Sequence, residues 1–296
     1  MVDAFVSLEF QLPIEIKGLT NEIRYSKQIP SSYNFNIIKS RSNRPETTKL
    51  IVFMFHGWDS SQESMIYKTR EWINQLVEKQ SDIDPSFINN LVFVQLNAPF
   101  VCEEDEIDNG IKTQSNERFW WTLDTLKIVQ MIHFDQFDEL FGPKGEGLDF
   151  SIEYARQIVN IVRYNHNSSA GVIFAGFSQG GGMALNMAIE CPENLCGVCI
   201  CSGLLNNFSE IQQALLRKWY NKRLMNVPIF HSHGSNDPTL SFKSGKAFHH
   251  HLKHVFHGKI VHHTFNGYHE ITKDTLDKMC FELIRMWNFH LENNVL

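Results

Sequence analysis

Short apolar runs alternate with longer stretches of helical periodicity along most of the chain. This alternation predicts an α/β fold in which a mostly parallel central sheet has helices on both faces. Each run is rich in Val, Ile or Phe and almost continuously apolar, as expected for strands buried on both sides. The expected strands are 50–55, 91–96, 171–175, 197–201, 227–232 and 259–265, and the expected helices are 62–79, 152–164, 179–189, 207–223, 241–256 and 273–291.

Other segments complete the expected layout. Weaker alternation at 6–12 and 34–38 predicts an antiparallel pair at the edge of the sheet. No Pro/Gly/Ser-rich linker divides the sequence, so we expect one domain over 1–296, with 1–45 as an N-terminal edge-strand extension. Two stretches, 102–118 and 131–147, fall outside the alternation, and the acidic residues of the first predict a solvated loop. The last helix carries an apolar stripe that should pack on the sheet, formed by Leu276, Cys280, Leu283, Trp287 and Leu291.

Composition narrows the possible partners. The 296 residues are 43% hydrophobic, which is typical of a globular protein. The net charge is −6 and the basic residues are spread along the chain, which argues against a nucleic-acid partner. Residues 1–10 lack the pattern of a secretory signal, and no apolar run approaches the roughly 20 residues that span a bilayer. We therefore expect a cytoplasmic protein without stable membrane insertion.

Cysteine and histidine clusters do not predict a metal site. The six cysteines are sparse for a disulfide scaffold, so we expect free thiols. Cys196, Cys199 and Cys201 lie around a predicted buried strand, and no second ligand pair stands at zinc-site spacing. A row of histidines falls on the predicted helix 241–256 and just beyond it, where neighbours project to different faces and no carboxylate follows at a matching offset. We expect a solvated basic face from this row, which comprises His249, His250, His251, His254 and His257.

The strongest chemical signal is G-F-S-Q-G at 176–180, between a predicted strand and a predicted helix. A G-x-S-x-G sequence in this setting is typical of the α/β-hydrolase fold, in which a sharp turn holds the serine exposed as a nucleophile. Ser178 is thus the candidate nucleophile. The Gln179 backbone N–H would lie at the helix N-terminus and could face an oxyanion.

A second oxyanion donor is expected after strand 50–55. There Gly57 allows the backbone to turn so that the Trp58 N–H can face the same point. We expect His56 to hold this turn by hydrogen bonds rather than to take part in catalysis.

The order of nucleophile, acid and base in this fold points to the remaining catalytic residues. Asp237 follows strand 227–232, and His269 follows the last strand, 259–265. Of the fourteen histidines, only His269 is predicted in that last loop, whereas His262 and His263 fall within the strand. A neutral imidazole of His269 would remove the proton of Ser178, and Asp237 would orient the ring and stabilise its protonated form.

These motifs, and others in the same order, resemble the acyl-protein thioesterase branch of the phospholipase/carboxylesterase family. The resemblance extends over roughly residues 50–290 and rests on F-H-G at 55–57, N-A-P at 97–99, W-W-T-L-D at 120–124, G-F-S-Q-G-G at 176–181, H-G-S-N-D-P at 233–238 and Y-H-E at 268–270. Three features depart from the family pattern: Trp58-Asp59-Ser60 stands in place of a Leu-Gly-Asp-like sequence, the chain has an extra N-terminal segment, and the 121–152 stretch is enlarged.

The resemblance implies hydrolysis of carboxylic esters or thioesters without a metal or an organic cofactor. Its substrates would be small molecules, lysophospholipids or acyl groups on protein cysteines. Two alternatives stay open, a serine peptidase of the same fold and a noncatalytic hydrolase-fold binding protein. Apolar residues that could line an acyl channel are Trp120, Trp121 and Leu204, together with Phe119, Leu205, Phe208 and Trp219.

Overall fold

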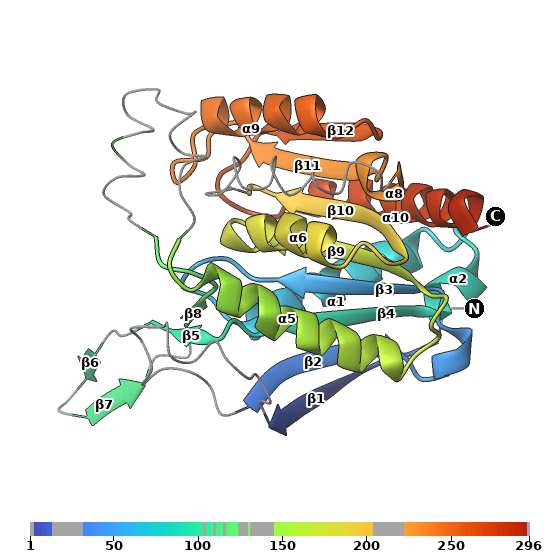
Figure 1. The fold of residues 1–296 in the computed structure, drawn as a ribbon, viewed down its shortest axis with the longest axis horizontal. Coiled ribbons are helices and arrows are strands. Elements are labelled where there is room, and N and C mark those ends of the chain that lie inside the picture. The colour runs from blue at the N-terminus through green and yellow to red at the C-terminus, as the bar shows by residue number, and fades with distance from the viewer. Residues whose placement is uncertain are drawn as a thin grey trace.

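An eight-stranded sheet forms the centre of the computed structural model, which describes residues 3–13, 32–102, 105–108, 111–114, 117–123, 130, 145–203 and 222–294. The strand order is β1-β2-β4-β3-β9-β10-β11-β12 (Figure 1). These strands are β1 (Phe5–Pro13), β2 (Ser32–Ser40), β3 (Leu50–Phe55), β4 (Leu91–Leu96), β9 (Gly171–Phe177), β10 (Leu195–Cys201), β11 (Ile229–Gly234) and β12 (Ile260–Phe265).

The sheet is parallel from β4 to β12 and antiparallel at its N-terminal edge. β1 pairs with β2, and β2 pairs with β4, in antiparallel register, while each later neighbour pair is parallel. The α/β class, the six predicted strands and the antiparallel edge pair are therefore confirmed. β11 begins two residues later than predicted, at Ile229, because Pro228 has no N–H to donate to the ladder.

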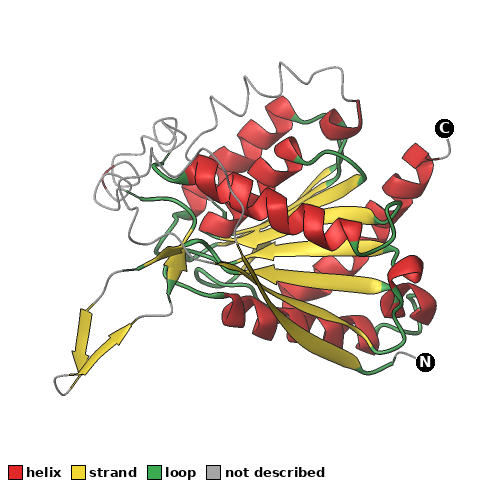
Figure 2. Cartoon of the chain, turned by 60° about the horizontal axis from the view of Figure 1, so that its bottom comes forward, coloured by secondary structure: helices red, strands yellow, loops and turns green. Residues whose placement is uncertain are grey.

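Among the described residues, five longer helices cover the two faces of the sheet (Figure 2). One apolar core joins one face to residues of α5, α6 and α9, and a second core joins the opposite face to α1 and α10. The bounds are α1 (Gln62–Glu78), α5 (Leu148–Tyr164), α6 (Gln179–Glu190), α9 (Phe242–Val255) and α10 (Lys273–Asn294), with shorter α2 (Pro85–Asn89), α8 (Lys222–Met225) and a 3-10 turn, η1 (Pro45–Thr47). The expected helix 207–223 lies almost wholly outside the described residues.

The predicted stripe on α10 packs on the sheet except at its end. Leu276, Cys280 and Leu283 are at most 1% exposed and belong to the second core, and Trp287 packs against it. Leu291 is 45% exposed, so the stripe's burial ends before this residue, near the C-terminal end of the helix. None of the described helices is long and apolar enough to cross a lipid bilayer.

The expectation of an acidic loop over 102–118 is wrong for part of its backbone. Two short antiparallel pairs form in and beside this stretch, and one of them extends away from the main sheet (Figure 1). The pairs are β5 (Phe100–Val101) with β8 (Arg118–Phe119), and β6 (Asp105–Asp108) with β7 (Ile111–Gln114). Most of the 131–147 stretch lies outside the described residues.

Candidate active site

Ser178 occupies a strained turn between β9 and α6. Its φ is 53° and its ψ is −120°, a region that residues with a Cβ rarely adopt. Glycine on either side makes the turn possible, because a Cβ on Gly176 would overlap the Gly180 carbonyl, and one on Gly180 would overlap the Phe55 carbonyl. The Ser178 N–H donates to Cys201 O at 2.9 Å and so ties the turn to the end of β10.

The loop after β3 reaches the same turn. A Cβ on Gly57 would lie only 3.3 Å from the Ser178 Cβ, so glycine allows this loop to approach the serine. Trp58 comes next, and its ring stacks on Phe119 with centroids 4.8 Å apart. Gln179 is the first residue of α6, where a backbone N–H has no intrahelical acceptor. Both expected oxyanion donors therefore belong to segments that adjoin Ser178.

His56 holds the loop as the sequence predicts. Its Nε2 accepts a hydrogen bond from the Ala98 N–H at 3.0 Å, and its Nδ1 lies 2.7 Å from Gly57 O. These partners require the neutral tautomer with the proton on Nδ1. Burial lowers the pKa of His56 to about 4, which keeps the ring neutral at physiological pH.

The Gln179 side chain has a role that the sequence did not reveal. Its Oε1 accepts the Trp120 N–H at 2.9 Å, and its Nε2 donates to Trp121 O at 2.8 Å. Trp120 is also tied to the β3 loop, because its indole Nε1–H donates to His56 O at 2.9 Å. The buried side-chain amide of Gln179 thus connects the Trp120–Trp121 backbone to the start of α6.

Two of the residues expected to line an acyl channel are completely buried. Trp120 is 0% exposed and Trp121 is 1% exposed, so in this conformation neither offers surface to an acyl chain. Phe119, at 7% exposed, contacts the ring of Trp58. Leu204, like Leu205, Phe208 and Trp219, lies outside the described residues.

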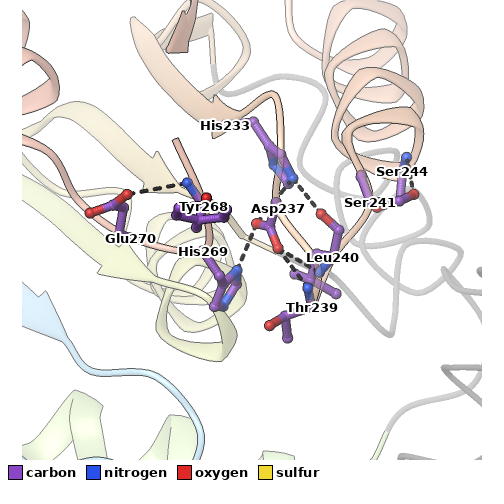
Figure 3. Close-up of polar contacts among 9 residues, drawn as sticks. All are labelled: His233, Asp237, Thr239, Leu240, Ser241, Ser244, Tyr268, His269 and Glu270. Carbon is purple, nitrogen blue, oxygen red and sulfur yellow. Dashed lines mark hydrogen bonds and ion pairs between the residues drawn. The ribbon is translucent and has the colours of Figure 1, made fainter. Parts of the chain in front are cut away.

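Asp237 and His269 meet beyond the ends of β11 and β12 (Figure 3). His269 Nδ1 lies 2.7 Å from Asp237 Oδ2. The other carboxylate oxygen accepts the backbone N–H groups of Thr239 at 2.9 Å and Leu240 at 2.8 Å. The Asp237 side chain is fully buried, whereas that of His269 is 16% exposed. The contacts hold a buried carboxylate against one nitrogen of the ring and leave part of the imidazole accessible.

His269 also lies against the residue that precedes the serine. Its ring packs on that of Phe177 with centroids 4.8 Å apart. Among the described residues, no hydrogen bond joins Ser178 to His269, a contact that in hydrolases often tightens only when substrate binds.

A second histidine, His233, approaches the same carboxylate and was not singled out from the sequence. Its Nε2 lies 2.8 Å from Leu240 O and 3.4 Å from Asp237 Oδ2. Burial lowers the pKa of His233, and its Nε2–H donates to the Leu240 carbonyl. The only sequence signal was its place in H-G-S-N-D-P, four residues before the acid.

The histidine row on α9 is not the uniformly solvated face that we expected. His249 is half-buried and stacks on His262 of β12 with centroids 4.3 Å apart, and His262 stacks on His231 of β11 at 4.9 Å. His231 is completely buried, and neither of its ring nitrogens has a hydrogen-bond partner in the part of the chain that the structure describes. His250 and His254 do face solvent.

The cysteines are free thiols, as predicted. Within the described residues, no three His, Cys, Asp or Glu side chains are grouped as a metal site.

Sequence comparison identifies the family. The sequence pattern of the phospholipase/carboxylesterase family matches residues 135–287, which is more than half of the chain. The chain belongs to the phospholipase/carboxylesterase family. The matched residues of this phospholipase/carboxylesterase domain include Ser178, Asp237 and His269 but not the loop that carries Trp58.

Relatives in this family are distant. Mouse lysophospholipase-like protein 1 is 32% identical over 108 residues, which are 36% of this chain and 44% of that protein. Acyl-protein thioesterase 1 of Debaryomyces hansenii is 30% identical over 123 residues, 41% of this chain and 51% of the relative. These alignments span about half the length of the curated relatives.

Solved structures share the α/β-hydrolase fold. Esterase PE8 has a TM-score of 0.58 and 19% identity, with 82% of this chain and 96% of that one covered. Zea mays acyl-protein thioesterase 2 has a TM-score of 0.57 and 16% identity, with 86% of this chain and 98% of that one covered. The predicted fold is therefore confirmed.

Proposed function

We propose that this protein is a serine hydrolase that cleaves carboxylic esters or thioesters with apolar acyl groups. One observation carries the proposal: a buried Asp237 carboxylate lies 2.7 Å from His269 Nδ1, and that ring packs against the residue preceding the strained Ser178. Membership of the phospholipase/carboxylesterase family supports the same chemistry.

The roles follow from the arrangement of protons and acceptors. Asp237 Oδ2 would accept the Nδ1–H of His269, leaving Nε2 free to take the hydroxyl proton as Ser178 Oγ attacks the acyl carbonyl. The protonated His269 would then return the proton to the leaving alcohol or thiol. A water molecule activated by the same ring would hydrolyse the acyl-enzyme.

Developing negative charge would be held by backbone amides. The Trp58 and Gln179 N–H groups would donate to the oxyanion of the tetrahedral intermediate, an effect often worth about 3 kcal/mol for each donor. The Gly57 approach to Ser178 and the position of Gln179 at the start of α6 support this assignment. The side-chain hydrogen bonds of Gln179 would keep the second donor in place.

The acyl specificity is proposed from the family and from the aromatic pair beside the β3 loop. Trp58 is partly exposed and stacked on Phe119, so it offers a fixed apolar surface near Ser178. Free acyl esters and acyl groups on protein cysteines share this apolar chain, and the printed names of the relatives include both a lysophospholipase-like protein and an acyl-protein thioesterase.

Active-site labelling tests the proposal. A fluorophosphonate should label the wild-type protein and should fail to label Ser178→Ala, which should also lose nearly all hydrolysis of p-nitrophenyl esters. Ser202→Ala is a matched control, because Ser202 also has a positive φ and follows the neighbouring strand, β10. It should keep the label and the activity.

The base is tested by a second matched pair. His269→Ala should abolish turnover, whereas His263→Ala, in the strand just before that loop, should leave most activity. A wild-type protein that is not labelled would be a noncatalytic binding protein. Efficient cleavage of peptide amides, with no activity on esters, would instead identify a peptidase.

A further inference from the structure

Two exposed histidines on α9 bring their ring nitrogens close together. His250 Nε2 and His254 Nε2 are 2.8 Å apart, and the ring centroids are 4.3 Å apart. The spacing of four residues places both side chains on one face of the helix, one turn apart. Both residues are solvent-exposed, so an ion could reach them directly.

The two distances show that the hydrogen bond between these nitrogens is bent. A straight N–H···N hydrogen bond would place the ring centres about 5 Å apart, because each nitrogen lies roughly 1.1 Å from its ring centre. Rings that direct their lone pairs at a common point about 2.1 Å away should instead have centres roughly 1.5 times as far apart as their nitrogens. The observed separations, 4.3 Å and 2.8 Å, have this ratio.

The nitrogen separation also indicates the preferred coordination geometry. Two ligands about 2.0–2.1 Å from one ion stand roughly 2.8–3.0 Å apart at a right angle but about 3.3 Å apart at a tetrahedral angle. The 2.8 Å between His250 and His254 therefore fits adjacent positions of a square-planar or octahedral ion. Imidazole pairs in this geometry suit Cu²⁺ and Ni²⁺, with water in the remaining positions.

The Lys246 side chain on α9 is directed away from His250. Lys246, one turn before His250, lies over the ring of Phe242 at 4.9 Å and is thus directed toward the start of the helix.

We propose that His250 and His254 form a two-histidine site for Cu²⁺ or Ni²⁺ on the exposed face of α9. The second imidazole would bind an ion already held by the first, so the pair should bind more tightly than either histidine alone. The bound ion would link successive turns of α9 and stabilise the folded chain. This site is independent of the proposed hydrolase activity.

Calorimetric titration of the tag-free full chain with Ni²⁺ tests the proposal. His250→Ala and His254→Ala should each weaken the tightest site at least tenfold, and the double variant should be no worse than either single variant. His257→Ala, a change at an exposed histidine just after the helix, is the matched control and should bind Ni²⁺ like the wild type. Circular dichroism of each variant checks that the fold is kept.

Two further measurements make the result specific. With Cu²⁺, electron paramagnetic resonance should show coupling to two imidazole nitrogens in the wild type and to one in either single variant. Saturating Ni²⁺ should raise the Tm of the wild type and of His257→Ala but not of the paired variants. Unchanged Ni²⁺ affinity in His250→Ala or His254→Ala would overturn the proposal, as would losses that simply add in the double variant.

Discussion

His233 Nε2 lies 3.4 Å from Asp237 Oδ2, the same oxygen that contacts His269 (Figure 3). His233 also donates from Nε2 to the Leu240 carbonyl at 2.8 Å, and the Leu240 N–H donates to the other oxygen of Asp237. The His233 ring therefore closes the loop that presents the acid. It acts through Asp237 and is a positioning residue in the proposed mechanism.

Replacing this ring tests its positioning role. His233→Phe keeps a planar side chain but leaves the buried Leu240 carbonyl without its donor, which should lower the free energy of unfolding by about 1–3 kcal/mol. We expect kcat for ester hydrolysis to fall about tenfold while KM changes little, because the acid loop is loosened and the acyl site is not. His257→Phe is the exposed control. An unaltered kcat in folded His233→Phe would leave His233 with a structural role only.

The Gln179 amide gives a second prediction, about stability. Gln179→Ala removes two hydrogen bonds and leaves the Trp120 N–H and the Trp121 carbonyl unpaired, so we expect a loss of about 2–4 kcal/mol in urea unfolding. Gln157→Ala, which removes a hydrogen bond to Glu153 on the partly exposed face of α5, should cost less than about 0.5 kcal/mol. Equal losses in the free energy of unfolding for the two variants would contradict the proposal that Gln179 holds Trp120 and Trp121 in place.

Acyl-chain length should govern the rate if the substrate class is correct. Each methylene buried near Ser178 should contribute about 0.8 kcal/mol, so two or three added carbons should raise kcat/KM about tenfold or more. The measurement is kcat/KM for p-nitrophenyl esters and acyl thioesters of increasing length, beside a panel of peptide amides. A rate that peaks at acetyl would reduce the acyl site to a small pocket.

Buried neutral histidines should make the fold sensitive to acid. Burial lowers the pKa of His262 to about 4, and it lowers that of the adjoining His231 well below its usual 6.5. Between about pH 6.5 and pH 4 the unfolded chain binds protons that the folded chain does not. The stability that these neutral rings contribute is therefore complete above this window and is lost as the pH falls through it.

Chemical denaturation at a series of pH values measures this loss. His262→Phe keeps a flat ring against His231 and His249 but cannot titrate, so its free energy of unfolding should fall less steeply between pH 6.5 and pH 4 than that of the wild type. His257→Phe should retain the wild-type slope. Parallel pH curves for wild type and His262→Phe would show that the stack does not titrate in this range.

Much of the fold could be predicted because burial on both faces leaves a simple pattern. The strand at 50–55 was predicted without error, since all six of its side chains are buried. Ser178 could be found because only glycine fits beside so tight a turn. The start of β11 could not be predicted correctly. Val227 and Pro228 are apolar like the strand that follows them, but the ladder begins only at Ile229.

Contacts between distant residues could not be predicted in this way. The Gln179 side chain meets Trp120 and Trp121, 59 and 58 residues away, and nothing in the local pattern records that pairing. The stacking of His249 on His262 likewise depends on how α9 crosses β12. Helical periodicity indicated that neighbouring histidines point in different directions, but not which one would meet the sheet.

The hydrogen bonds of Trp120 give the protein a built-in optical reporter. Its indole is fixed to the carbonyl of His56 and its backbone to the side chain of Gln179, so the ring is coupled to both segments that adjoin Ser178. The chain has six tryptophans, and replacing Trp120 with phenylalanine would separate its emission from the rest. Any ligand that displaces the turn should then change the fluorescence of the wild type more than that of the substituted chain, without a coloured substrate or an attached dye.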